Sequence, residues 1–414
     1  IKVLKISGIT LGSVAALLYI TPHFFKDTIT KSVNEIAKDY VKSKVSFESV
    51  NLSFYKHFPN LTVTLDNSKI GASEHFPNQN FIEAKEIALG IDLFSLFGDK
   101  ITFNQLYLNK AEIFVKMDSL GNQNFDIFIS DEEQPKDDSS TNLAFDKILV
   151  TNTNLLYADE KTKVKLQATN LSYDGLVNFI NNKIDLVANA SIEKVLFTMD
   201  DVVYIDQKSL KGDLNTSIDL NDLALTFNKD NWVLEKFPFS VNGKIAFPEN
   251  EMVFDLHVTS INNKLVDLLS VVPKSYQSWY DNTTIEGNSN INFSLVGKLN
   301  DSLKMSPNLN LDVQVSNGLL NYKKGPHPIK NLSFDTKILL PNLNPDSLKI
   351  SVSDFNFNLN EGFAKGNLNY IAPTTIQANI NAKLDLGTLK QASGLDKFDM
   401  KGLLELDGEV NGTY

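Results

Sequence analysis

The side chains that could do chemistry are few and scattered. The five histidines are His23, His57, His75, His257 and His327, and no two of them have the spacing of metal ligands. The HExxH, Gly-x-Ser-x-Gly and P-loop motifs are absent from the sequence. The chain has no cysteine, which excludes disulfides, thiolate nucleophiles and cysteine zinc sites. We therefore predict that the protein is not an enzyme, with no catalytic residue, no metal ligand and no cofactor.

Acidic side chains are numerous, but most alternate with apolar residues or lie in loops. A carbohydrate-acting enzyme remains an alternative, because its two carboxylates can come from distant strands. The densest acidic segment is residues 130–142, SDEEQPKDDSSTN. Its order does not match an EF-hand loop. We predict an exposed or disordered linker there, with a calcium site as the alternative.

The charge balance bears on the partners of the chain. The formal net charge is −11, which argues against a nucleic-acid partner. Every basic residue is lysine, and arginine, the preferred bidentate clamp for phosphate, is absent. We expect no nucleic acid among its ligands.

The N-terminal 25 residues include a long apolar segment. Residues 6–25 contain no charged side chain, and a helix of about 20 residues spans the roughly 30 Å hydrocarbon core of a bilayer. Lys2 and Lys5 precede this segment, which places the N-terminus in the cytoplasm and the rest of the chain outside it. We predict a retained transmembrane anchor over 1–25. A cleaved signal peptide is the alternative.

The segment after the anchor has one apolar helical face. Its apolar residues recur at steps of three or four, with charged residues between them. A helix packed on the first sheet and a helix lying on the membrane surface both fit this pattern, and the mixed charge favours the first. The face consists of Phe25, Ile29, Val33, Ile36 and Tyr40.

From Val45 onward the hydrophobic period becomes two residues. Strict alternation predicts strands with one apolar and one wet face, usually in antiparallel sheets. We predict a mainly β protein with an elongated antiparallel sheet. Its parts are an amphipathic helix with a β domain over 26–129, the linker 130–142, and a repetitive β region over 143–414 that is truncated at its C-terminal end.

Turn-forming residues separate the alternating segments. Asn-Gly, Glu-Gly and Asp-Gly pairs are typical of hairpins. The segments 106–115, 148–157 and 313–322 resemble one another, each with the order strand, Asn-containing turn, strand. Repeated hairpins predict a sheet that grows by addition. One helix is predicted over 265–280, interrupted by Pro273. The turn pairs are Asn317-Gly318, Glu361-Gly362 and Asp174-Gly175.

Several segments resemble the AsmA family, especially its Bacteroidetes-type branch. They follow an apolar anchor and an amphipathic helix, in the order that this family has. They are packing and turn signatures and include no catalytic residues. The segments are VSFESVNLSF at 45–54, HFPNL at 57–61, AKEIALGIDL at 84–93, LLSVVPKSY at 268–276, and the alternating strands around Gly287 and Gly297.

The resemblance implies a single-pass protein of a Gram-negative-type cell envelope, with its bulk in the periplasm. Relatives fold as long, curled sheets with an apolar groove, similar to bridge-like lipid-transfer proteins, and act in phospholipid movement and outer-membrane homeostasis. The expected partners are membrane phospholipids. Roughly 20 strands about 4.8 Å apart give a sheet on the order of 100 Å long, which fits a truncated chain or an envelope protein partner.

The apolar strand face is the expected functional surface, lining a lipid groove. The alternatives are a dry sandwich core, as in a structural or adhesive surface protein, and the carbohydrate-acting enzyme. The expected groove-lining residues are Ile291, Phe293, Leu295, Leu309, Leu311, Val313, Val315, Phe355, Phe357, Leu359, Ile376 and Ile380.

Overall fold

The described residues cover most of the chain after the predicted anchor. The anchor at 1–25 and residues 130–141 of the acidic linker lie outside them, so both stay predictions. No helix in the described part is long and apolar enough to cross a membrane. The computed structural model describes residues 29–35, 37–38, 41–54, 61–92, 94–95, 98, 102–127, 129, 142–180, 183–219, 224–248, 251–272, 274–300, 302–394 and 399–413.

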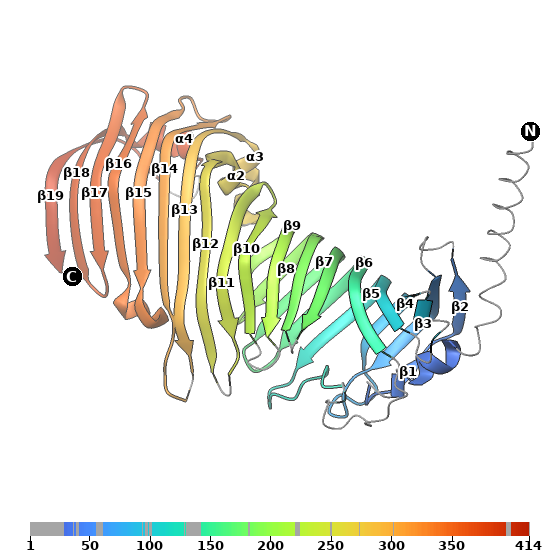
Figure 1. The fold of residues 1–414 in the computed structure, drawn as a ribbon. Helices are drawn as coiled ribbons and strands as arrows, with labels where there is room; N and C mark the ends of the chain where they lie inside the picture. The colour runs from blue at the N-terminus through green and yellow to red at the C-terminus, as the bar shows by residue number, and fades with distance from the viewer. Residues whose placement is uncertain are drawn as a thin grey trace, which may run out of the picture. The chain divides into compact units, whose positions relative to one another are not determined.

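The strands form one open sheet of 19 strands (Figure 1). The predicted mainly β, antiparallel architecture is confirmed, because the described strand pairs are antiparallel apart from β5 and β6. All the described strands belong to this sheet.

The chain divides into two compact units. The first comprises the chain to Ile180 together with Val187–Ser209, and the second comprises Asn181–Leu186 and Leu210–Tyr414. The boundary runs through β8 (Lys183–Met199) and β9 (Val202–Asp219), a position that the sequence did not indicate. The other strands of the first unit are β1 (Val45–Ser46), β2 (Ser49–Ser53), β3 (Leu61–Gly71), β4 (Asn80–Ile91), β5 (Thr102–Met117), β6 (Asn142–Asp159) and β7 (Val164–Ile180).

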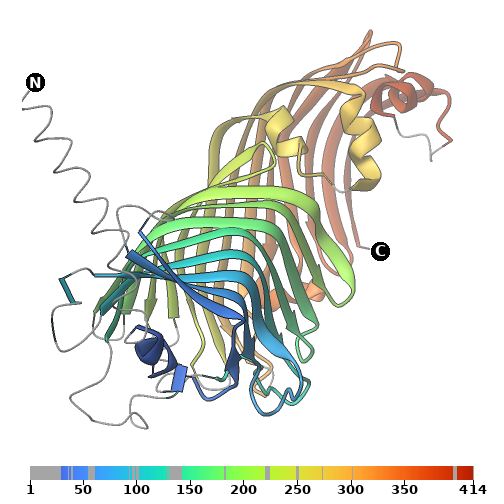
Figure 2. The same ribbon diagram turned by 90° about the vertical axis from the view of Figure 1, so that its right-hand side faces the viewer.

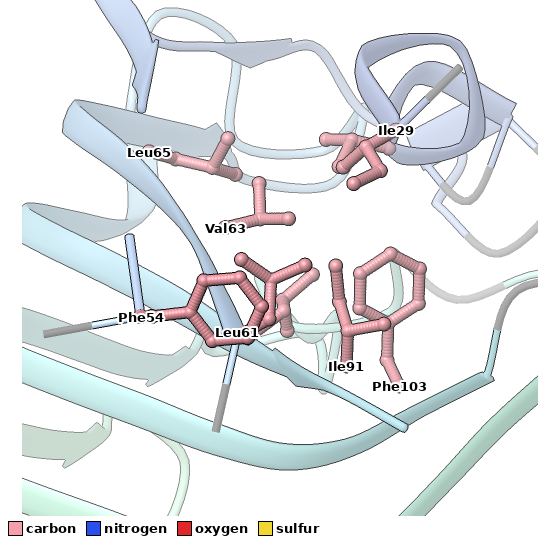
Figure 3. Packing of buried hydrophobic residues seen from close by; sticks show 9 residues of the cluster. Ile29, Phe54, Leu61, Val63, Leu65, Ile91 and Phe103 are labelled. Atoms are coloured by element: carbon pink, nitrogen blue, oxygen red, sulfur yellow. The ribbon is translucent and has the colours of Figure 1, made fainter. Parts of the chain in front are cut away.

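A helix over 29–35 and 37–38 packs on the part of the sheet that belongs to the first unit. Ile29 is 0% and Val33 4% exposed, and they meet Leu61 and Val63 of β3 and Phe103 of β5 in one cluster (Figure 3). These contacts confirm the interpretation of a helix packed on the sheet. The other residues of the predicted face, Phe25, Ile36 and Tyr40, lie outside the described residues.

The pairing of β5 with β6 departs from the expected antiparallel order. Thr102 lies opposite Asn142 and Met117 opposite Asp159, so these two strands are parallel. Parallel neighbours need a long crossover in place of a tight turn. The connection over 118–141 provides that length, and it contains most of the acidic segment, which therefore joins two strands of one unit.

The second unit consists of consecutive antiparallel strands, side by side in chain order in Figure 1. Its strands after β9 are β10 (Ala224–Leu234), β11 (Phe237–Ala246), β12 (Met252–Lys264), β13 (Thr283–Leu299), β14 (Asn308–Tyr322), β15 (Ile329–Leu340), β16 (Lys349–Leu359), β17 (Gly362–Ile371), β18 (Thr375–Asp385) and β19 (Leu403–Thr413).

Short helices lie at one end of these strands, which we call the helical end (Figures 1 and 2). They are α2 (Leu265–Leu269), α3 (Gln277–Asp281) and α4 (Leu386–Ser393), with a 3-10 turn, η2 (Lys274–Tyr276), before α3. The predicted helix over 265–280 is thus two shorter helices, and the proline between them lacks the amide that a continuous helix needs. The turns η3 (Pro341–Leu343) and η4 (Pro345–Ser347) lie at the opposite end, the loop end.

Most of the predicted Asn-containing turns are wrong, because the chain passes through them as one strand. Asn152 lies within β6 and Asn317 within β14, each with a positive φ, at 50° and 54°. The register shifts in β14, where two residues, Ser316 and Asn317, face the single residue Ser333 of β15. These are β-bulges, which bend a strand without ending it. Asp174-Gly175 also lies inside a strand, β7, whereas Glu361-Gly362 forms the predicted turn.

Polar side chains satisfy the backbone amides that the bulges free. Asn262 of β12 donates its backbone N–H to the side-chain oxygen of Asn290, 2.7 Å away. The buried carboxylate of Asp230 accepts from the backbone of Asn215 at 2.7 Å. An orphaned amide in a sheet costs free energy, and a neighbouring amide or carboxylate oxygen removes that cost. This explains part of the asparagine content of the chain.

Candidate functional site: the apolar face of the second unit

The strand register assembles one continuous apolar face in the second unit. Residues directly opposite one another share a face of the sheet. Phe293 lies opposite Val258 on one side and Leu311 on the other. The same row continues through β15 to β18 with Ile338, Ile350, Tyr370 and Ile376.

Two further rows flank this one. We call the three rows together the open rows. The row on the loop-end side consists of Leu256, Leu295, Leu309 and Leu340. The row on the helical-end side consists of Ile291, Val313, Thr336, Val352 and Leu368.

The side chains of the open rows are partly exposed, neither dry nor fully solvated. Sheets normally bury an apolar face against a second layer of structure. Within the second unit, the described helices pack at the helical end and leave the central and loop-end rows partly exposed. The open rows are therefore a partly exposed apolar surface of the second unit.

At the helical end the same face is covered. Val315 of β14 is 4% exposed and packs with Leu265 of α2 and Trp279 of α3. Phe357 and Leu359 of β16 are 8% and 3% exposed and pack beneath α4. The apolar face thus changes along its strands from a covered band at the helical end to an uncovered band towards the loop end.

Capping residues hold α4 in this position. The Asp385 carboxylate accepts a 2.6 Å hydrogen bond from the backbone N–H of Thr388 at the start of the helix. These hydrogen bonds lower the pKa of Asp385 from its usual value of 3.8. After the last turn, Gly394 adopts φ +68°, and a Cβ there would lie 2.8 Å from the Trp279 ring. Glycine is therefore required where α4 meets α3.

The twelve residues that the sequence selected all lie on this apolar face, but in two environments. The register carries the face from Leu311 to Ile376 and, past the bulges, to Ile380 opposite Gly366 and Phe355. Those in the covered band are Val315, Phe357 and Leu359, with Val313, Phe355 and Ile380 packed at its border. The others lie in the open rows away from the helices: Ile291, Phe293, Leu295, Leu309, Leu311 and Ile376.

The residues selected from the sequence did not include every member of the open rows. In β15 the three apolar residues Ile338, Leu339 and Leu340 are consecutive, so the alternation is hidden. In β12 and β16 the signal was present, since Leu256 and Val258 flank His257, and Ile350 and Val352 flank Ser351. The helix α4 was also missed, although Asp385 and Gly394 mark its two ends.

The opposite face of the second unit is polar, and side-chain hydrogen bonds link its neighbouring strands. Asn310 donates to Ser294 at 3.2 Å, and Asn290 donates to Gln314 at 3.1 Å. Such cross-strand pairs stabilise a wet sheet surface. Apolar and polar residues are thus segregated on the two faces of the same strands.

The first unit has its own apolar face. Ile87 of β4 lies opposite Leu65 and Leu108, and Leu108 lies beside Val150. Tyr173 continues this row opposite Val150. Burial among these side chains raises the pKa of its phenol, because an apolar surrounding disfavours the charged form.

No group of three or more His, Asp or Glu side chains that could hold a metal ion is found in the described part of the chain. Besides Asp385, hydrogen bonds within a turn lower the pKa of Asp118. A pocket of about 180 Å³ between the β16–β17 turn and α4 is too small for a two-tailed lipid.

Comparison with known proteins identifies the family to which this chain belongs. A search of curated proteins found no match. The model of the AsmA family matches residues 1–252, which is more than half of the 414 residues. The match spans the first unit and continues into β12 of the second. This chain therefore belongs to the AsmA family.

Proposed function

We propose that this protein binds phospholipid acyl chains along the apolar face of its sheet and supports lipid homeostasis of the outer membrane. The observation that carries the proposal is the set of open rows, which stay partly exposed beyond the band that the helices of the second unit cover. Membership of the AsmA family supports a place in the cell envelope and a lipid-related role.

The energetics favour such a ligand. Each methylene removed from water contributes about 0.8 kcal/mol, so the roughly 30 methylenes of a two-tailed lipid make transit through water very costly. Partly exposed leucine, valine, isoleucine and phenylalanine side chains offer an apolar surface that lowers this cost. An acyl chain on the open rows would in turn provide the second layer that they lack.

The register supports movement along the face as well as binding. The central open row continues without a charged residue from Val258 to Ile376, across seven strands. Neighbouring strands are about 4.8 Å apart, so an acyl chain moving from strand to strand keeps apolar contacts. The proposed topology has the N-terminal segment in the inner membrane and the bulk in the periplasm.

The test uses the intact chain and a matched pair of double variants. One is Phe293→Glu with Leu311→Glu, and the other is Ser294→Glu with Asn310→Glu. Both place two glutamates directly opposite one another on β13 and β14, so the like-charge cost is matched and only the face differs. Phospholipid carried through purification is measured by mass spectrometry, with circular dichroism as the check on folding.

We expect wild-type protein and the polar-face variant to carry phospholipid, and the apolar-face variant to lose at least about tenfold of it. Equal amounts of lipid on the two folded variants would sink the proposal, and so would wild-type protein without any lipid.

A further inference from the structure

A group of exposed apolar residues lies at the loop end of the second unit, and we call it the loop-end cluster. It involves three successive connections, β11–β12, β13–β14 and β15–β16, which follow one another along this end (Figure 1). Single apolar residues are common on protein surfaces, whereas a group of them indicates an interaction surface. The members are Phe247, Val296, Leu303, Met305, Leu339 and Leu343, each between 38% and 66% exposed.

The β13–β14 connection holds its two apolar side chains in a hydrogen-bonded loop. Asn300 and Met305 exchange two backbone hydrogen bonds of 3.0 Å, which close the loop. The side chain of Asn300, which is buried, accepts a further 3.0 Å hydrogen bond from the backbone N–H of Leu303. The loop's own hydrogen bonds therefore fix the backbone from which Leu303 and Met305 project into solvent.

Polar contacts join this loop to the connections on either side. Lys298 precedes the loop and lies 2.8 Å from Glu251 of the β11–β12 connection, measured between Nζ and Oε1. Asn308 follows the loop and accepts a 2.9 Å hydrogen bond from the backbone N–H of Asn342 in η3. Alternate connections at one end of a sheet are two strands apart, about 10 Å. The three connections thus form one continuous surface.

The strand ends beside this surface carry exposed apolar residues on both sides of the sheet. On the apolar face, the loop-end row is partly exposed. On the polar face, Val296 lies opposite Asn308, and Leu339 lies opposite Asn310. A partner docked on one face would cover only one of these groups. An environment that surrounds the loop tips and the strand ends would cover both.

The interface of a lipid bilayer is such an environment. Exposed apolar side chains are buried at the boundary between head groups and acyl chains, while lysine amines reach the head groups. Lys304 lies between Leu303 and Met305, so the loop carries both kinds of side chain. The backbone N–H groups of Leu303 and Met305 already have hydrogen-bond partners. Shallow insertion therefore leaves neither of these amides unpaired in an apolar medium.

We propose that the loop-end cluster is a membrane contact, which inserts Leu303 and Met305 into the interface of a phospholipid bilayer. The contact is separate from the predicted N-terminal anchor. It is also separate from the acyl-chain binding proposed for the open rows, because the inserted side chains belong to the loop and not to those rows.

The test uses a single fluorescent label, which the absence of cysteine makes possible. The intact chain carries Ser302→Cys, next to Leu303, labelled with nitrobenzoxadiazole, an environment-sensitive dye. The control carries the same label at Lys324→Cys, an exposed turn residue at the helical end of β14. Both proteins are incorporated into vesicles of phosphatidylethanolamine and phosphatidylglycerol. Quenching by iodide in the water and by nitroxide groups on the lipid acyl chains is measured at each position.

Three double variants of the protein labelled at position 302 identify the side chains responsible. Leu303→Ser with Met305→Ser removes the apolar side chains of the loop. Leu120→Ser with Tyr204→Ser removes exposed apolar side chains from the first unit and is the matched control. Phe293→Glu with Leu311→Glu disrupts the open rows and separates bilayer contact from lipid held on the apolar face. Circular dichroism checks the folding of each protein.

We expect the label at position 302 to be quenched by the nitroxide lipid and protected from iodide, and the label at position 324 to show the reverse. Leu303→Ser with Met305→Ser should reduce the nitroxide quenching to the level at position 324. The other two double variants should leave it unchanged.

Equal iodide quenching at the two positions would overturn the proposal. Protection from iodide without nitroxide quenching would overturn it too, because a second copy of the chain or another protein would then cover the loop. A loss of nitroxide quenching in Phe293→Glu with Leu311→Glu would assign the signal to lipid on the open rows, against a bilayer contact. Absence of bound lipid from the purified protein, with nitroxide quenching retained at position 302, would refute the proposed function and leave the membrane contact standing.

Discussion

Gly318 of β14 lies opposite Leu332 of β15, and a Cβ atom on Gly318 would lie 2.8 Å from the Cβ of Leu332. The preceding residue, Asn317, has a φ of 54°. Asn317 and its neighbour Ser316 form a bulge on the helical-end side of Val315, within the covered band. The strand thus bends where α2 and α3 pack on the apolar face.

Replacing Asn317 by valine should destabilise the second unit by about 1–2 kcal/mol, because a β-branched residue is strained in the left-handed region. Asn317→Gly should be nearly neutral, since glycine adopts this conformation freely. Urea unfolding followed by tryptophan fluorescence measures the difference, and both tryptophans, Trp232 and Trp279, belong to the second unit. Equal unfolding midpoints for the two variants would contradict the assignment of the bulge.

Trp232 provides a direct probe of the apolar face. It lies on β10 opposite Phe239, which shares a face of β11 with Val241, the residue opposite Val258 of the central row. Its ring lies over Gly212. In a Trp279→Phe background, phospholipid with brominated acyl chains should quench the fluorescence of Trp232, because bromine quenches at contact distance. The control removes both native tryptophans and adds Asn310→Trp on the polar face. Quenching of equal strength in the two proteins would count against an acyl chain on the apolar face.

The N-terminal helix should stabilise the first unit through Ile29. Truncation to alanine is expected to cost about 2–4 kcal/mol, as for other fully buried aliphatic side chains. Lys31→Ala on the exposed side removes a surface ion pair with Glu35 and should change stability by about 0.5 kcal/mol or less. Hydrogen exchange of the β3 amides measures both. Similar protection in the two variants would show that the helix is not part of the core.

The docking of α4 should depend on pH through Asp385. Its pKa is lowered in the folded state by the hydrogen bonds to Thr388, so the contribution is present above the ordinary value of 3.8. It is lost as the pH falls through the lower folded-state pKa. Hydrogen exchange of α4 between pH 6 and pH 2 measures this loss. Asp385→Asn keeps the cap without a charge, and its protection factors, which are exchange rates relative to an unstructured amide at the same pH, should lack this pH dependence. A matching pH dependence in Asp385→Asn would place its origin elsewhere.

The sequence by itself determined which side chains share a face. Because successive strand residues point to opposite sides, the alternation of Phe293 and Leu295 with Asn292 and Ser294 was sufficient to place them, and the helical spacing of Ile29 and Val33 was sufficient for the first helix. These patterns are local, and they survive in any tertiary arrangement that contains a strand or a helix at that place.

The tertiary structure alone decided how these elements are joined. Asn317-Gly318 has the composition of a hairpin turn, but the register with β15 makes it a bulge, because long-range pairing outweighs local turn preference. The parallel pairing of β5 with β6 likewise depends on contacts far apart in sequence. Whether Phe357 or Phe293 is covered depends on where α4 docks, and that position is set by packing between segments that are distant in the chain.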